Sequence, residues 1–76
     1  MTRLHPVRAR QAISFLLSRG FGLVRQRGSH KFFRHPDGRT ATVPDHPDED
    51  LGRGILTKIF RDAESSPGEF LTWLNR

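Results

Sequence analysis

The sequence predicts a small α+β domain with a three-stranded antiparallel sheet, in the order helix, three strands, helix and short helix. Three observations predict this fold. Apolar residues recur at helical spacing near both ends of the chain, they alternate with a period of two in the middle, and turn-forming segments separate the middle runs. The 76 residues, 34% of them hydrophobic, suffice for one modest core, so we expect a single domain of residues 1–76.

The first expected element is a helix that starts at Pro6, where proline is tolerated as the first helical residue, and ends near Arg19. Its apolar face follows the helical spacing and consists of Ala9, Ala12, Ile13, Leu16 and Leu17. Gly20 is the expected left-handed cap of this helix, and Phe21 is expected to fold back onto it.

Three strands are expected to follow, at residues 21–27, 30–35 and 40–43. Gly28 and Ser29 separate the first two, and a Pro- and Gly-containing turn at residues 35–39 separates the others. Regular alternation in the first strand would place Phe21 and Leu23 on one face, and Gly22, Val24 and Gln26 on the other. By the same rule, only one of Phe32 and Phe33 can face the core.

The last part of the chain is expected to hold a loop and two helices. The loop, residues 44–54, contains the acids Asp45, Asp48, Glu49 and Asp50, which we expect to be solvated and to cap the next helix. The apolar stripe of that helix consists of Ile55, Leu56, Ile59, Phe60 and Ala63. Ser66, Pro67 and Glu69 then form a capping-box pattern, and Phe70, Trp73 and Leu74 share one side of a short final helix.

The charge is unevenly distributed. The formal net charge is +5, but residues 1–44 contain nine Lys or Arg and one Asp, a balance of +8, whereas residues 45–76 have a balance of −3. A basic half suggests a surface for a polyanion, usually nucleic acid, although a charge run alone is more often a solvated face. The lack of cysteine removes disulfides, thiolate nucleophiles and Cys-based zinc sites, and no apolar run is long enough to span a bilayer. We therefore expect a cytoplasmic protein without membrane contact.

The remaining catalytic candidates are mainly the four histidines. His5 is expected to be solvated, His35 to serve the turn that follows it, and His46 to be a solvated residue of the acidic loop. No histidine spacing matches a helical metal site, and the acidic loop does not have the spacing of a calcium loop. We therefore expect no metal and no cofactor.

His30 differs from the other histidines because it directly follows the Gly28-Ser29 turn within a basic run that contains Arg25, Arg27, Lys31 and Arg34. A phosphate held by the turn amides and the basic side chains would lie close to an imidazole that can exchange a proton near neutral pH. The alternative is a turn histidine that only hydrogen-bonds backbone, and the local sequence alone favours that alternative.

The run from Gly20 to Arg39, GFGLVRQRGSHKFFRHPDGR, followed by Thr42-Val43-Pro44 and His46, resembles the HicA family of bacterial toxins. The resemblance continues through residues 51–59 and 66–74 and so covers nearly the whole chain. Its most specific part is the Gly-Ser-His run before an aromatic strand. Position 31 is Lys where a second His is common in that family.

The resemblance implies a fold similar to double-stranded RNA-binding domains, with an α-β-β-β-α core, and a ribonuclease activity that cleaves messenger RNA. It implies that His30 is the catalytic residue and that Gly28 and Ser29 shape the turn before it. It also implies a type II toxin-antitoxin system in which a HicB antitoxin covers this region.

The mechanism we expect is metal-independent: His30 activates a ribose 2′-hydroxyl for attack on the adjacent phosphate, and Arg25, Arg27, Lys31 or Arg34 stabilises the developing charge. The second proton carrier is left open among Lys31, His46 and water. Two other functions remain open. The chain could bind RNA without cutting it, or its basic face could serve to dock an acidic partner protein.

Overall fold

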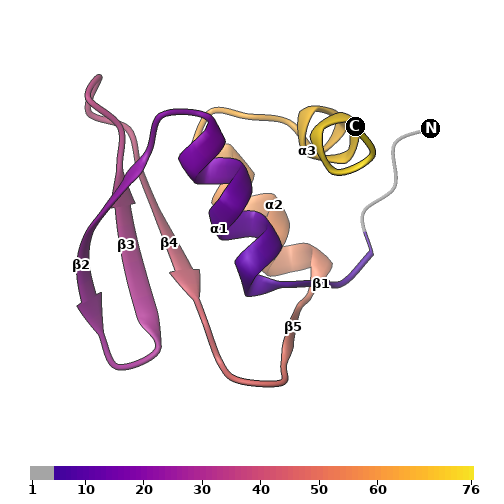
Figure 1. Ribbon diagram of the computed structural model, residues 1–76, viewed down its shortest axis with the longest axis horizontal. Coiled ribbons are helices and arrows are strands. Elements are labelled where there is room, and N and C mark those ends of the chain that lie inside the picture. The colour runs from indigo at the N-terminus through magenta and orange to yellow at the C-terminus, as the bar shows by residue number, and fades with distance from the viewer. Residues whose placement is uncertain (1–4) are drawn as a thin grey trace.

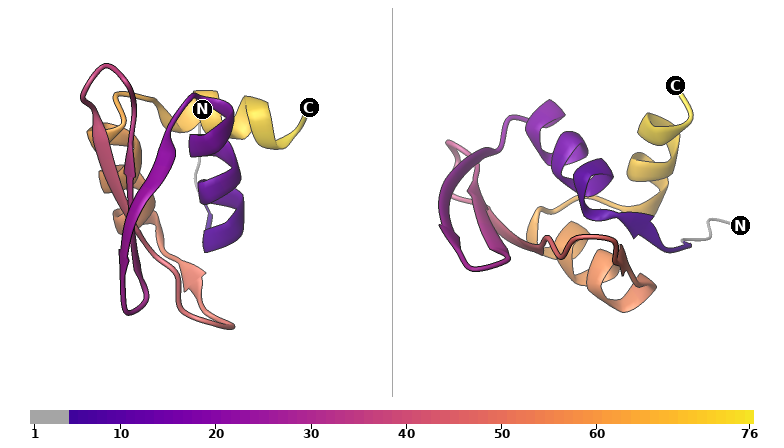
Figure 2. Two further views of the ribbon diagram at one scale, coloured as in Figure 1. Left: turned by 60° about the vertical axis from the view of Figure 1, so that its left-hand side comes forward. Right: turned by 60° about the horizontal axis from the view of Figure 1, so that its bottom comes forward.

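In the computed structural model, which describes residues 5–76, one sheet carries two helices on one side (Figure 1). The elements in chain order are β1 (Val7–Arg8), α1 (Ala9–Ser18), β2 (Gly22–Arg27), β3 (His30–Arg34), β4 (Thr40–Pro44), β5 (Asp50–Leu51), α2 (Arg53–Asp62) and α3 (Pro67–Leu74). Helices α1 and α2 both pack against the sheet at β4, while α3 contacts α1 at the far side (Figure 2). No helix or strand of residues 5–76 covers the other face of the sheet, which we call the open face.

Helix α1 begins three residues later than the sequence suggested. Its N-cap is Arg8, whose backbone amide donates to the side-chain oxygen of Gln11 at 3.1 Å. Pro6 therefore lies outside the helix, and the expectation that it is the first helical residue is wrong. The reason is that Val7 and Arg8 are extended and pair with residues 50 and 51, forming the small sheet of β1 and β5. Strands this short have no periodicity that a sequence could display.

The end of α1 confirms the expected cap. Gly20 has a φ of +94°, which only glycine adopts without strain. Its amide donates to the carbonyl of Leu17 at 3.1 Å, and the amide of Phe21 donates to the carbonyl of Leu16 at 3.0 Å. These two bonds define a Schellman motif, and they turn the chain directly from α1 into β2.

The main sheet is antiparallel with the order β2-β3-β4, and its hairpins are the expected ones. The alternation within β2 differs from the expectation, because Leu23 pairs with Phe33 while Arg25 pairs with Phe32. Val24 is thus the extra residue of a β-bulge. Beyond it, each side chain of β2 points to the face opposite to the one it would occupy in a regular strand. Arg25 and the residues after it change faces as a result.

The acidic loop also differs from the expectation, since its carboxylates do not cap α2. The N-cap of α2 is Gly52, a residue without a side chain, so the helix has no side-chain cap at this position. Asp45 instead lies 2.7 Å from the Lys31 ammonium, and Asp50 lies 3.3 Å from the Arg8 guanidinium. These acids are therefore engaged by basic side chains from β3 and β1.

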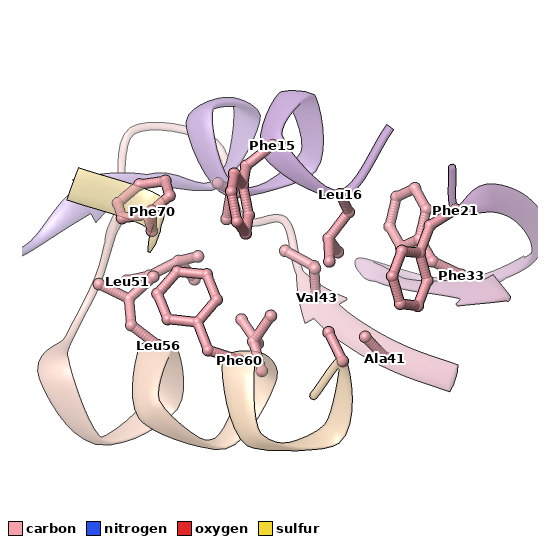
Figure 3. Packing of buried hydrophobic residues seen from close by; sticks show 14 of the residues in the cluster. Phe15, Leu16, Phe21, Phe33, Ala41, Val43, Leu51, Leu56, Phe60 and Phe70 are labelled. Carbon is pink, nitrogen blue, oxygen red and sulfur yellow. The ribbon is translucent and has the colours of Figure 1, made fainter. Parts of the chain in front are cut away.

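The core lies between the sheet and the helices and is rich in aromatic residues (Figure 3). Phe15 of α1 meets Phe60 of α2 and Phe70 of α3 edge-to-face, with ring centroids 5.6 and 5.4 Å apart. Phe33 from the sheet is buried in the same core and lies beside Phe21 (Figure 3), whereas Phe32 is on the open face, as parity required. Leu17 and Ile55, both expected in apolar stripes, are 51% and 45% exposed, because each points about 100° away from a buried neighbour.

Helix α3 begins at the predicted place, with the hydroxyl of Ser66 accepting from the amide of Glu69 at 3.1 Å and Pro67 in the first turn. The second bond of the expected capping box is not formed within residues 5–76, because the Glu69 side chain does not hydrogen-bond to the Ser66 amide. The Glu69 carboxylate lies 4.0 Å from the guanidinium of Arg19. The succession of α1, β2, β3, β4 and α2 gives the α-β-β-β-α order of a small double-stranded RNA-binding-domain-like fold. The fold class predicted from the sequence is confirmed.

Candidate functional site

The open face of the sheet gathers basic and aromatic side chains from two strands. His30, Phe32 and Arg34 alternate along β3 and point to this face. The register pairs Arg27 with His30 and Arg25 with Phe32, so both arginines share the face with their partners. We refer to these five residues as the basic face. Arg25 and Arg27 belong to this face because the bulge at Val24 redirects the second half of β2.

Phe32 is the aromatic centre of the basic face. The Arg25 guanidinium lies over its ring, 4.6 Å from the centroid, in a cation–π arrangement. A shallow groove of about 410 Å³ beside this pair is also lined by Arg34 and, from β4, by Thr40 and Thr42. An aromatic ring beside cations offers a nucleotide both a stacking surface and charge for its phosphate.

His30 stands at one end of the basic face, at the start of β3, and its side chain is exposed. The turn before it contains only Gly28 and Ser29 and joins the paired residues Arg27 and His30. Gly28 has a φ of +59°, as the first central residue of a type II′ hairpin turn requires, which explains the glycine at this position. The turn thereby brings the His30 imidazole next to the guanidinium-bearing strand.

The structure brings His46 to the same end of the sheet, although the sequence suggested a solvated loop residue. The Asp45 amide donates to the carbonyl of Ser29 at 2.7 Å, so the loop after β4 continues along the β2–β3 turn. The His46 ring lies 6.5 Å from the His30 ring, centroid to centroid, and its Nε2 lies 3.3 Å from the Ser29 hydroxyl. The proximity of His46 to His30 could have been predicted from the strand register, because His30 pairs with Pro44 and residues 45 and 46 follow Pro44 directly.

Lys31 is placed apart from the basic face. It follows His30 on β3 and therefore points to the opposite face, where its ammonium lies 2.7 Å from Asp45. Both side chains of this pair are about one third exposed. Of the predicted RNA-binding side chains, the structure thus brings Arg25, Arg27 and Arg34 together with His30, and it holds Lys31 in an ion pair.

The two other histidines lie away from this site. His35 packs edge-on against Phe21, and its Nδ1 accepts from the Asp37 amide at 3.1 Å, so it serves the turn as expected. In the same turn, the hydrogen bond from the Arg39 amide lowers the pKa of the Asp37 carboxyl below its ordinary value, with smaller lowering effects from the Arg39 guanidinium and the His35 ring. His5 is exposed and precedes β1.

The basic face carries little compensating negative charge. Within residues 5–76, no carboxylate lies within 4 Å of the guanidinium groups of Arg25, Arg27 or Arg34. The same part of the chain contains no group of three His, Cys, Asp or Glu side chains arranged to hold a metal ion. Its helices are too short or too polar to cross a membrane.

Fold and site together define a small α+β domain with an open, basic sheet face and a pair of histidines at one end of that face. Residues 9–64 match the family described as the HicA toxin of bacterial toxin-antitoxin systems, which covers most of the chain and includes the whole candidate site. The chain belongs to the HicA toxin family, and the resemblance noted in the sequence is thereby confirmed. A search of curated proteins finds no significant match.

Proposed function

We propose that this toxin is an endoribonuclease that cleaves messenger RNA on the basic face, with His30 as its general base. Membership of the HicA family makes the chain a toxin with an antitoxin partner. The observation that supports the proposal is the position of the exposed His30 imidazole, which is paired across the strands with Arg27 and follows the turn of Gly28 and Ser29. The site thus combines a proton acceptor, the His30 imidazole, with neighbouring cationic groups that can bind a phosphate.

The proposed reaction starts from a ribose 2′-hydroxyl, which DNA lacks. His30 accepts the proton of this hydroxyl while the 2′-oxygen attacks the adjacent phosphorus. Arg27 and the amides of Gly28 and Ser29 stabilise the charge on the phosphate, and Arg25 and Arg34 hold neighbouring phosphates along the sheet. Phe32 provides a surface on which a base can stack. Lys31 acts indirectly, by holding Asp45 and with it the loop beside the turn.

We further propose that the antitoxin is a HicB-type protein and that it inhibits by covering the basic face. An acidic or apolar partner surface laid over Arg25, Phe32 and His30 would exclude RNA from the same groove. The exposed side chain of Val24 on the edge strand β2 lines the same groove and offers apolar contact area.

The test compares the parent chain with His30→Ala and with His5→Ala, a matched histidine variant outside the site. Each is incubated with a long single-stranded RNA, with and without EDTA, and fragment formation is followed after circular dichroism has shown that all three are folded. A general base contributes about 10²- to 10⁴-fold, so we expect His30→Ala to lose at least two orders of magnitude in rate. His5→Ala should cleave like the parent, and EDTA should have no effect.

Three results would contradict the proposal. Cleavage by folded His30→Ala at the parent rate would exclude His30 as the base. If the parent and His30→Ala both bind the RNA and leave it intact, the protein is a module that binds RNA without cutting it. Strong inhibition of cleavage by EDTA would contradict the metal-independent mechanism.

A further inference from the structure

We infer that His46 is a second catalytic residue, the general acid that protonates the departing 5′-oxygen of the cleaved RNA. This inference rests on the proposed ribonuclease function and deepens it, because a single histidine leaves the leaving group without a proton donor. His46 belongs to the segment after β4 and is 16 positions from His30 in the sequence, yet the two rings are 6.5 Å apart.

The separation of the two rings suits a phosphate between them. Their planes are inclined by 77°, and both side chains are exposed, so a substrate can enter from solvent. One hydrogen bond of about 2.8 Å from each ring can reach different oxygens of the same phosphate group. A base for the attacking oxygen and an acid for the departing oxygen are then both in reach.

Four contacts hold His46 in this place. Its Nε2 lies 3.3 Å from the hydroxyl of Ser29, and the Asp45 amide bonds to the Ser29 carbonyl at 2.7 Å. The Lys31 ammonium clamps the Asp45 carboxylate at 2.7 Å. On the other side, the Glu49 amide donates to the His46 carbonyl at 3.3 Å. This last bond closes a turn in which Pro47 presets the backbone and Asp48 has a φ of +61°, the pattern of a type II turn.

Ser29 has a defined role in this arrangement as a positioning residue. When His46 is doubly protonated, its Nε2–H can donate to the Ser29 hydroxyl, and Nδ1–H remains for the substrate. An imidazole oriented by a third group in this way matches the general design of acid–base sites, in which the catalytic ring is itself held by a hydrogen bond.

The proton and bond changes balance without any further reactant. The 2′-oxygen forms a bond to phosphorus and its proton passes to His30, while the bond from phosphorus to the 5′-oxygen breaks and His46 supplies a proton to that oxygen. The products are a 2′,3′-cyclic phosphate and a 5′-hydroxyl end. His30 is then protonated and His46 neutral, and exchange with water restores both. Lys31 is a poorer donor for this step because it is held by Asp45 on the opposite face of β3.

The test uses two RNA substrates that are identical except for the atom that leaves. In the second substrate, sulfur replaces the bridging 5′-oxygen at the cleavage position, and a thiolate departs without needing a proton. We expect folded His46→Ala to cleave ordinary RNA about 10²-fold or more slowly than the parent, and to cleave the sulfur-containing RNA at close to the parent rate. His30→Ala should be slow on both substrates, and His5→Ala should match the parent on both.

The outcomes separate this inference from the proposed function. If the parent cleaves neither substrate, the proposed function is wrong and this inference falls with it. If the parent cleaves both and His46→Ala is as fast as the parent on ordinary RNA, the inference alone is wrong and water is the proton donor. If His46→Ala is equally slow on both substrates, His46 has a structural role and is not the acid.

A second pair of variants tests the positioning role of Ser29. Ser29→Ala should slow cleavage of ordinary RNA by about five- to tenfold, the effect of one lost hydrogen bond, and should leave cleavage of the sulfur-containing RNA unchanged. Ser29→Thr retains the hydroxyl and should restore the rate on ordinary RNA. An equal loss on both substrates would contradict the link between Ser29 and His46.

Discussion

At the scale of single residues, two neighbours in the sequence lie on opposite faces of the sheet. Phe32 and Phe33 are adjacent and chemically identical, but the pleat of β3 turns one to the basic face and the other into the core. The sequence predicted that they must differ without saying which was which. The core packing of the neighbouring strand decides it, since Ala41 and Val43 are buried on the same side as Phe33.

This difference predicts opposite effects of the same substitution. Phe33→Ala removes a buried ring and should lower the free energy of unfolding by about 3–5 kcal/mol, much of the stability of so small a domain. Phe32→Ala should change stability by less than about 1 kcal/mol and weaken RNA binding by about 5- to 100-fold through loss of stacking. Thermal unfolding gives the stabilities, and fluorescence anisotropy in a His30→Ala background gives the affinity for intact RNA.

Equal destabilisation by the two Phe substitutions would show that Phe32 is a core residue. An unchanged affinity of Phe32→Ala would show that bases do not stack on this ring.

His30 and His46 show where prediction at this scale ends. His30 could be singled out because its signal is local: a glycine turn, basic neighbours and a recognised run of residues. The position of His46 depends on the register of β3 and β4 and on the bond between Asp45 and Ser29, which are contacts between distant parts of the chain. A local pattern therefore identified one of the two histidines, and only the fold brings the other to it.

At the scale of elements, the sequence predicted the helices and strands whose apolar residues follow a clear periodicity or that end at a recognisable cap or turn. Helices α1 and α2, the three strands of the main sheet and the cap at Gly20 are of this kind. Two features escaped prediction for physical reasons. The pairing of β1 and β5 involves two residues on each side, too few for a period, and the bulge at Val24 breaks a period that a sequence reading assumes to be regular.

The bulge has a functional consequence, because it decides the direction of two arginines. In a regular strand, Arg25 and Arg27 would share the face of Phe21 and Leu23 and point toward the helices. With one extra residue, they lie beside Phe32 and His30 instead. A single inserted position therefore decides that these two positive charges lie on the open face of the sheet.

Two glycines in different elements predict opposite changes in stability on substitution by alanine. At Gly20 the φ of +94° is strained for alanine, and a Cβ would meet the His35 ring at 3.0 Å, so Gly20→Ala should destabilise by about 1–2 kcal/mol. Gly54 lies in the first turn of α2 with open space around it, so Gly54→Ala should stabilise by about 0.5–1 kcal/mol. Urea denaturation measures both free energies of unfolding, and a stabilising Gly20→Ala would contradict the strain expected for alanine at this positive φ.

At the scale of the whole molecule, the arrangement of charge matters more than its sum. The net charge of +5 combines a basic sheet with acids that lie mostly in the loop before α2 and in the C-terminal helices. Asp45 and Asp50 are engaged by Lys31 and Arg8, respectively, which leaves the arginines of the basic face available to an anion. A phosphate backbone would therefore be attracted to one face of the domain.

This asymmetry can be measured through the salt dependence of RNA binding. Each phosphate neutralised on a single strand contributes about −0.7 to the slope of log affinity against log salt concentration. In a His30→Ala background, Arg27→Gln should make the slope shallower by about 0.7. Lys58→Gln removes the same charge from an exposed position of α2, where Lys58 pairs with Asp62 at 2.8 Å, and should leave the slope unchanged. If both variants reduce the slope equally, RNA responds to the net charge of the molecule and does not bind at the basic face; if only Arg27→Gln does, the sheet is where the phosphates lie.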